Sequence, residues 1–153
     1  MPPGPEHVDQ AQHNLNFLET FFRDHKFNDW SITVAFYTSV HIVENAIFNV
    51  QDISFQGDQL KILHSDDLEK ALQKANIKFS SLSPHVARNL IVEENFLQIA
   101  NHHKSLYRQS RNSRYKKYQI TDIETDIIVK PALREIIEWS NSNYKTKFRV
   151  NLN

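Results

Sequence analysis

The sequence contains no cysteine, only two glycines in 153 residues, and no net charge. The absence of cysteine excludes disulfide bonds, thiolate zinc sites and cysteine nucleophiles, so nothing favours an oxidising compartment. Two glycines fall far below the roughly 7% of average usage, which disfavours glycine-rich phosphate loops and folds with many tight turns. Eighteen basic residues balance 18 acidic ones, so binding of nucleic acid would require an uneven distribution of charge along the chain.

Long apolar runs are also missing. The most apolar stretch, Trp30 to Val50, is interrupted by His41 and Glu44 and does not reach the ~20 apolar residues that span a bilayer. Met1 to Pro5 carry no cationic segment ahead of an apolar run, so they do not resemble a signal peptide. We therefore expect a single domain over residues 1–153, located in the cytoplasm and without a membrane partner.

Apolar residues recur at spacings of three and four over most of the chain, which is the period of an amphipathic helix. We expect an all-α fold, an antiparallel up-and-down bundle of four to five helices around one central buried helix. The central helix is expected to begin at Trp30, because apolar side chains after it fall on every face. The expected helices span residues 8–25, 30–50, 66–78, 84–114 and 122–146.

Capping residues support three of these helix starts. Ser65 and Ser83 are expected to cap the third and fourth helices, and Pro84 suits the first helical position because its missing amide donor costs nothing there. Thr121 and Glu124 form a capping box before the last helix, in which each side chain satisfies a backbone donor of the other residue.

The period also assigns particular side chains and segments. Leu97 is expected on the apolar face of the fourth helix, and Ile123 and Ile127 on the core face of the last. Pro131 predicts a kink or a restart within the last helix, because it lacks an amide donor and clashes with the preceding turn. Residues 51–64, which show no clean period, are expected to form a loop, and residues 146–153 a frayed tail.

Tyr37, His41 and Glu44 are spaced four and three apart, which places them on one stripe of the most buried helix. One interpretation is a site that lines an internal cleft, with His41 as an acid, base or ligand and Glu44 orienting it. The other is a structural network in which the histidine and the carboxylate bond each other and an arginine, since unpaired buried polar groups are costly.

Residues 104–117 hold six of the 18 basic residues and no acidic one, interleaved with tyrosines. Such a stripe suits RNA, because arginine bonds phosphate bidentately and aromatic rings stack on bases, and it also suits an acidic protein partner. The alternative is a stripe neutralised by acidic residues of the last helix, among them Asp122, Glu124 and Asp126. The predicted binding residues are Lys104, Tyr107, Arg108, Arg111, Arg114 and Tyr115.

Eight histidines raise the question of a metal site. Neither His-Glu-x-x-His nor Glu-x-x-His, the spacings that place ligands on one helical face, occurs. His41 and Glu44 supply two ligands, and a third would have to come from His13 or His103 on another helix. We expect no metal and no cofactor.

Two segments resemble HEPN-like proteins (higher eukaryotes and prokaryotes nucleotide-binding). Residues 29–46 are similar to their second helix, in which an Asp-Trp, a Phe-Tyr and a histidine followed by Glu-Ala recur. Residues 106–115, Leu-Tyr-Arg-Gln-Ser-Arg-Asn-Ser-Arg-Tyr, are similar to the Leu-Tyr, Ser-Arg and Ala-Arg-Tyr ending of a long helix in the same proteins. The resemblance implies a helical bundle, frequent homodimerisation, and a role in RNA cleavage, toxin–antitoxin pairs or antiviral defence.

Active members of that family carry an arginine, usually followed by a polar residue, with a histidine four to six positions later. Arg88-Asn89 begins in this way, but Val92, Glu93 and Glu94 stand where the histidine is needed. Arg108, Arg111 and Arg114 likewise have no histidine at these offsets. We therefore predict a catalytically degenerate module that acts by binding RNA or an acidic protein.

Two alternatives remain open. In the first alternative, the chain is a metal-independent ribonuclease with a nonstandard site drawn from His41, Glu44, His102, His103 and Arg111. In the second it is a structural dimerisation module without a ligand.

Overall fold

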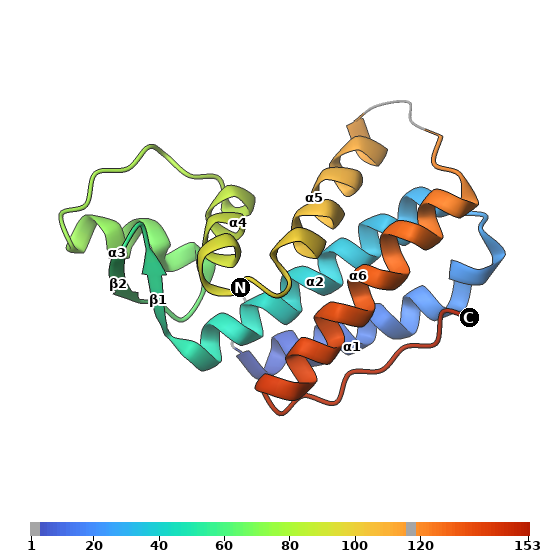
Figure 1. The fold of residues 1–153 in the computed structure, drawn as a ribbon, viewed down its shortest axis with the longest axis horizontal. Coiled ribbons are helices and arrows are strands. Elements are labelled where there is room, and N and C mark those ends of the chain that lie inside the picture. The colour runs from blue at the N-terminus through green and yellow to red at the C-terminus, as the bar shows by residue number, and fades with distance from the viewer. Residues whose placement is uncertain (1–3, 116–118) are drawn as a thin grey trace.

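The structure, a computed structural model, describes residues 4–115 and 119–153, with the backbone alone for Tyr115. These residues are predominantly helical, as expected, with one two-stranded sheet (Figure 1). None of the helices in these ranges combines the length and the apolar character needed to cross a bilayer. The elements are α1 (Gly4–Phe21), η1 (Phe22–Asp24), α2 (Asn28–Val50), β1 (Asp52–Phe55), β2 (Asp58–Lys61), η2 (Ser65–Asp67), α3 (Leu68–Lys74), α4 (Pro84–Asn95), α5 (Ala100–Tyr115) and α6 (Asp122–Asn143).

α2 packs against α1, α5 and α6, and α5 also packs against α6. Figure 1 shows the hairpin and α3 gathered near the C-terminal end of α2. Buried residues fall on every face of the middle of α2, where Ile32, Phe36 and Val43 are fully buried. The sequence predicts that the buried part of this helix begins at Trp30. This prediction is wrong, because the Trp30 side chain lies in the first turn and is 58% exposed. The helix is enclosed only where its neighbours cross it.

Residues 51–64 contain a hairpin instead of the expected loop. β1 pairs antiparallel with β2, and Ile53 lies opposite Leu60. The two turn residues, Gln56 at φ 50° and Gly57 at φ 86°, both adopt the left-handed region that tight hairpins favour. Glu94 on α4 accepts hydrogen bonds from both turn amides, at 2.8 and 3.3 Å. The sequence hides this hairpin because glutamine is an atypical turn residue and its stabilising partner is distant in the chain.

The single helix expected over residues 84–114 is in fact two helices. α4 ends at Asn95, whose Nδ2 donates to the carbonyls of Ile91 and Ser54 at 2.9 Å each. Its Oδ1 accepts from Ser54 N at 2.7 Å, so the side chain ties the helix end to β1. The chain then turns through residues 96–99 before α5, and Leu97 is 76% exposed there instead of lying on an apolar helix face.

Two of the predicted helix starts are confirmed. Ser83 Oγ accepts from Val86 N at 3.3 Å, with Pro84 at the start of α4. Thr121 and Glu124 form the capping box of α6. Both motifs depend on neighbours within three residues, which is why the local sequence is sufficient to predict them.

Other local predictions are wrong. His64, and not Ser65, caps the turn before α3, because its Nδ1 accepts from Asp66 N at 3.0 Å. Of the kink or restart predicted at Pro131, the restart is absent, because α6 is continuous from Asp122 to Asn143. Ile123 and Ile127 are 73% and 66% exposed, because α6 turns a different face to its neighbours. The face that α6 buries includes Val129, Leu133 and Ile136.

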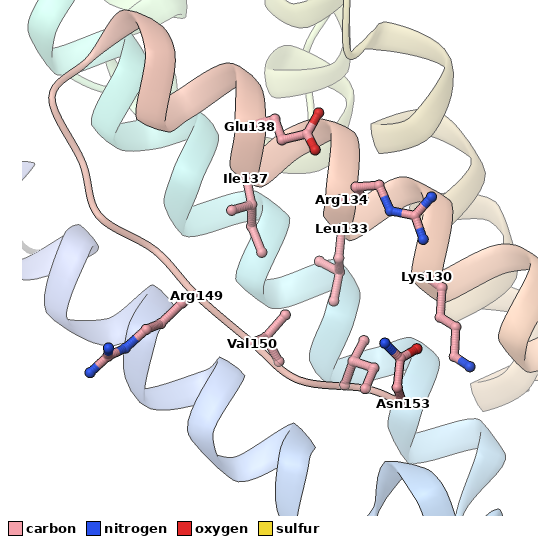
Figure 2. Close-up of a pocket in the computed structure, with 9 residues that line it drawn as sticks. Lys130, Leu133, Arg134, Ile137, Glu138, Arg149, Val150 and Asn153 are labelled. Carbon is pink, nitrogen blue, oxygen red and sulfur yellow. The ribbon is translucent and has the colours of Figure 1, made fainter.

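The segment after α6 is not a frayed tail. Its backbone exchanges hydrogen bonds with Gln12 of α1, through both the amide and the carbonyl of Arg149. Phe148 and Leu152 are buried. Figure 2 shows Val150 facing α6 while the side chain of Arg149 points away from it, and both residues line a pocket of about 250 Å³. The segment therefore connects the first helix to the last.

Candidate functional site

The basic residues predicted to bind RNA or an acidic partner lie along α5. Lys104 forms an ion pair with Glu93, with 3.1 Å between Nζ and Oε1. Arg108 is exposed. Arg111 is also exposed, and its Nη1 donates to the hydroxyl of Tyr107 at 3.3 Å. Of this group, Lys104 is therefore partly neutralised, whereas Arg111 is held beside an aromatic ring.

Arg114 joins α5 to α2. Its Nη1 donates to the hydroxyl of Tyr37 at 3.0 Å, and its guanidinium carbon lies 5.8 Å from the centre of that ring. Its Nε also donates to the carbonyl of Ser110 at 3.3 Å. Tyr37 thus belongs with the arginines of α5 and not with His41. The side chain of Tyr115, which was predicted to bind as well, lies outside the described residues.

Tyr37, Arg111 and Arg114 line a groove of about 820 Å³ at the surface, whereas Lys104 and Arg108 do not line it. α2 supplies one wall, α5 the other, and the start of α4 with its capping serine closes one side. No carboxylate lies among the described residues that line it. We call it the α5 groove, and its lining consists of Tyr37, Ser83, His85, Tyr107, Arg111, Asn112 and Arg114.

An aromatic cluster supports the α5 groove from below. The ring of Phe36, which is buried, lies 5.6 Å from that of His85 and 5.7 Å from that of Tyr107, between ring centres. His85 and Tyr107 are themselves 5.7 Å apart. Burial lowers the pKa of His85, and the charges of Arg88 and of the groove arginines lower it further. The imidazole in the groove is therefore neutral at pH 7.

The acidic residues at the start of α6, which would neutralise the basic stripe in the structural alternative, have other partners. Neither Arg108 nor Arg111 forms an ion pair with them within the described ranges. Their contacts are Asn28 with Asp122 at 2.8 Å, His25 with Asp126 at 2.9 Å, and Thr121 with Glu124 in the capping box. These carboxylates therefore do not neutralise Arg111 in the groove.

Glu44 forms a second centre, buried behind the groove. Its Oε1 accepts from Arg88 Nε at 2.9 Å and from the Ser65 hydroxyl, and its Oε2 accepts from Ser65 N at 3.1 Å. His64 Nε2 lies 3.1 Å from the same Oε2. Glu44 and Arg88 are almost fully buried. The sequence correctly predicts a buried carboxylate with an arginine, but the histidine at Glu44 is His64.

His41 points to a different partner. Its Nδ1 lies 2.9 Å from Nδ1 of His7 in α1, so one ring donates to the other. The rings of His7 and His64 stack with their centres 5.4 Å apart, which brings His7 close to Glu44. Burial lowers the pKa of His41, with Arg88 as the next cause. The sequence predicts a contact between His41 and Glu44, and the structure does not show it.

His103 lies under the α5 groove and does not reach into it. It is 1% exposed, and its Nδ1 lies 2.6 Å from the hydroxyl of Ser39. Burial is the main cause that lowers its pKa to about 3. Of the histidines predicted for a ribonuclease site, neither His41 nor His103 lines the groove with Arg111.

His85 and Arg88, one turn apart on α4, are the functional residues that sequence reasoning does not select. Nη1 of Arg88 lies 3.3 Å from Nδ1 of His85, while its Nε bonds Glu44. The guanidinium of Arg88 thus contacts both His85 in the groove and Glu44 in the buried centre. The available signal was the spacing of three between a histidine and an arginine in the first turns of a helix.

No family model matches this chain, and neither a curated protein nor a solved structure matches it. The chemistry of the groove and of the buried centre is therefore the basis for assigning a function.

Proposed function

We propose that this chain is a HEPN-like module that binds single-stranded RNA in the α5 groove without cleaving it. The observation that carries the proposal is the composition of the groove lining, where two tyrosine rings and a neutral histidine lie beside two arginines. Arginine bonds the phosphate oxygens of the backbone, and the rings offer stacking surfaces to unpaired bases.

The family likeness extends this proposal. In this extended proposal, the antiparallel bundle of HEPN-like proteins is formed by α1, α2, α5 and α6. The chain acts as a homodimer in a toxin–antitoxin, defence or regulatory setting. The contacts of α2 with the other three helices support the bundle. Catalysis is not part of the proposal, because the family's arginine with a histidine four to six residues later is missing.

RNA fits the groove better than an acidic protein does. An acidic protein requires positive charge alone, whereas this groove places Arg111 against the hydroxyl of Tyr107 and Arg114 against that of Tyr37. Each guanidinium is thus fixed beside an aromatic ring, so a phosphate and its neighbouring base can be bound together.

The first test is the salt dependence of binding, measured by fluorescence anisotropy with a labelled single-stranded RNA. If Arg108, Arg111 and Arg114 each neutralise one phosphate, affinity falls about 20-fold between 50 and 200 mM salt, since the slope for single strands is roughly −0.7 per contact. Absence of binding, or binding that salt does not weaken, contradicts the proposal.

The second test uses matched variants. Arg111→Gln is expected to reduce the salt slope by about 0.7, and Tyr107→Leu to weaken binding at least about fivefold through lost stacking. Arg134→Gln, an exposed arginine on α6 outside the groove, is the control and leaves both quantities unchanged. If an acidic peptide binds equally well and Tyr107→Leu does not affect it, the partner is an acidic protein.

Metal-independent cleavage of RNA is a second candidate, favoured by the position of His85. Its neutral ring lines the groove with Arg111 and Arg114. Its Nε2 can accept the proton of a 2′-hydroxyl in the tautomer that protonates Nδ1, which gives up the 3.3 Å contact with Arg88. No second histidine lines the groove among the described residues, so the leaving group would take its proton from Tyr37 or Tyr107. Cleavage of the bound RNA in the presence of a chelator, abolished by His85→Ala, would establish this candidate in place of simple binding.

A further inference from the structure

The buried centre around Glu44 contains donors that the proposed function does not use. One ring nitrogen of His7, one of His64 and one carboxylate oxygen of Glu44 all lie within 4.8 Å of one another. The three residues come from α1, α2 and the turn before α3, so only the folded chain brings them together. Two imidazoles and one carboxylate form a ligand set that divalent transition metals favour.

The second observation is a nitrogen without a partner. His7 is 1% exposed, its Nδ1 is engaged by His41, and its Nε2 has no hydrogen-bond partner among the described residues. A buried nitrogen in this state is unfavourable unless a ligand satisfies it. Nε2 of His64 also lacks a well-directed hydrogen bond, although it lies 3.1 Å from Glu44 Oε2.

We propose that His7, Glu44 and His64 form a binding site for a divalent transition-metal ion of the zinc class. The 3.1 Å between His64 Nε2 and Glu44 Oε2 is close to the roughly 3.3 Å that separates two ligands of a tetrahedral zinc ion. The ligand nitrogen of His7 lies within 4.8 Å of both of these atoms, so its ring has to move towards them to bind the same ion. Three protein ligands leave a fourth coordination position open.

Each ligand has a supporting contact of the kind that fixes metal ligands. When Nε2 of His7 binds the metal, its Nδ1 carries the proton and donates to His41 at 2.9 Å. When Nε2 of His64 binds, the proton moves to its Nδ1, which gives up its hydrogen bond from Asp66 N and donates instead to Asp66 Oδ2 at 3.3 Å. Arg88 and the Ser65 hydroxyl hold Oε1 of Glu44, and Ser65 N donates to Oε2, which keeps its other lone pair for the ion.

Protonation and access are compatible with this role. Burial and the neighbouring His41 lower the pKa of His7 to about 4, so its ring is neutral at pH 7, the form that binds metals. The side chain of His64 is 12% exposed, so the cluster is not completely closed off from solvent. The charge of Arg88 opposes a cation, so the expected affinity is weaker than that of a zinc site without it.

The sequence leads to the opposite expectation, that no metal binds. That reasoning pairs Glu44 with His41 and seeks the third ligand in His13 or His103. In the structure, His41 is a supporting partner, His13 is exposed on α1, and the ligands are His7 and His64. The site shares no residue with the α5 groove, so each proposal can fail without the other.

The test is isothermal titration of the full chain with zinc chloride and, separately, with magnesium chloride. We expect one zinc ion per chain and no magnesium binding, because magnesium prefers oxygen ligands. His7→Gln and His64→Gln are each expected to weaken zinc binding at least about tenfold. His13→Gln, which replaces an exposed histidine of the same helix, is the matched control and leaves zinc binding unchanged.

A measurement on the unaltered protein guards against variants that do not fold. In NMR spectra, added zinc is expected to shift the ring protons of His7 and His64 and to leave those of His13 unchanged. Lack of saturable zinc binding overturns the proposal, as does a loss on His13→Gln equal to that on His7→Gln. Ring shifts confined to exposed histidines overturn it as well.

Discussion

Arg88 donates a hydrogen bond from Nε to Oε1 of Glu44 over 2.9 Å, and neither side chain is more than 2% exposed. A buried ion pair of this kind is costly to break, because the remaining charge has no water to replace its partner. Ser65 and His64 add contacts to the same carboxylate, so the pair anchors α4 and the turn before α3 onto α2.

Glu44→Gln and Arg88→Met are each expected to lower the free energy of unfolding by about 3 to 5 kcal/mol, measured by urea denaturation. The double variant should lose less than the sum of the two, since no unpaired charge remains. The control is Lys104→Met at the exposed Lys104–Glu93 pair, expected to cost no more than about 1 kcal/mol. Equal losses for the buried and the exposed pairs would contradict this account.

His103 should make the fold sensitive to acid. Its pKa is about 3 when folded, against 6.5 when unfolded, so below pH 6.5 the unfolded state binds a proton that the folded state does not. The contribution of neutral His103 to the free energy of unfolding is therefore fully present above pH 6.5. Below that pH, this group alone lowers the free energy of unfolding by ~1.4 kcal/mol per pH unit down to about pH 3. His103→Asn is expected to remove one proton from the pH slope of stability, and an unchanged slope would show that His103 is not buried in its neutral form.

His25 should behave in the opposite way. A hydrogen bond to Asp126, at 2.9 Å, raises its pKa above 6.5. Its contribution to stability is therefore full below pH 6.5 and is lost as the pH rises through the raised value. Titration of the ring protons by NMR should give a pKa above 6.5 that Asp126→Asn returns towards the ordinary value. Lys130→Gln, which alters the longer 3.8 Å contact of Asp126, should leave the raised pKa in place.

The two tryptophans should differ in fluorescence. Trp30 is 58% exposed, whereas Trp139 is 5% exposed and packs its ring against that of Phe96. In Trp139→Phe, the remaining Trp30 should emit further to the red and be readily quenched by acrylamide. In Trp30→Phe, the remaining Trp139 should emit further to the blue and be quenched less. Equal quenching of the two variants would contradict the position of α2. The expected homodimer, if it covers Trp30, would make that quenching decrease as protein concentration rises.

Local motifs are what the sequence reveals most directly. The caps at Ser83 and at Thr121 with Glu124 follow from side chains that bond backbone within three residues. The sequence does not reveal the end of α4, because this end depends on the hydrogen bonds of Asn95 with β1, 41 residues away in the chain. The period of α6 shows apolar faces but not which of them meets a neighbour, so Ile123 is misplaced by sequence reasoning.

The candidate sites show the same division. Tyr107, Arg111 and Arg114 line the α5 groove, and their spacing on one helix already suggests a common surface. Their partners Tyr37 and His85 come from other elements, and periodicity carries no information about which elements meet. Glu44 is correctly placed in the interior, but its histidine is supplied by the turn before α3, which packs there only after folding.

The segment beyond α6 hydrogen-bonds to α1 through Gln12 and Glu19, and it buries Phe148 and Leu152. These contacts join α1 to a segment that is made after all the helices and strands described above. A nascent chain therefore leaves this side of α1 uncovered until residues 148–152 have emerged from the ribosome, and the fold closes only after translation of that stretch is complete.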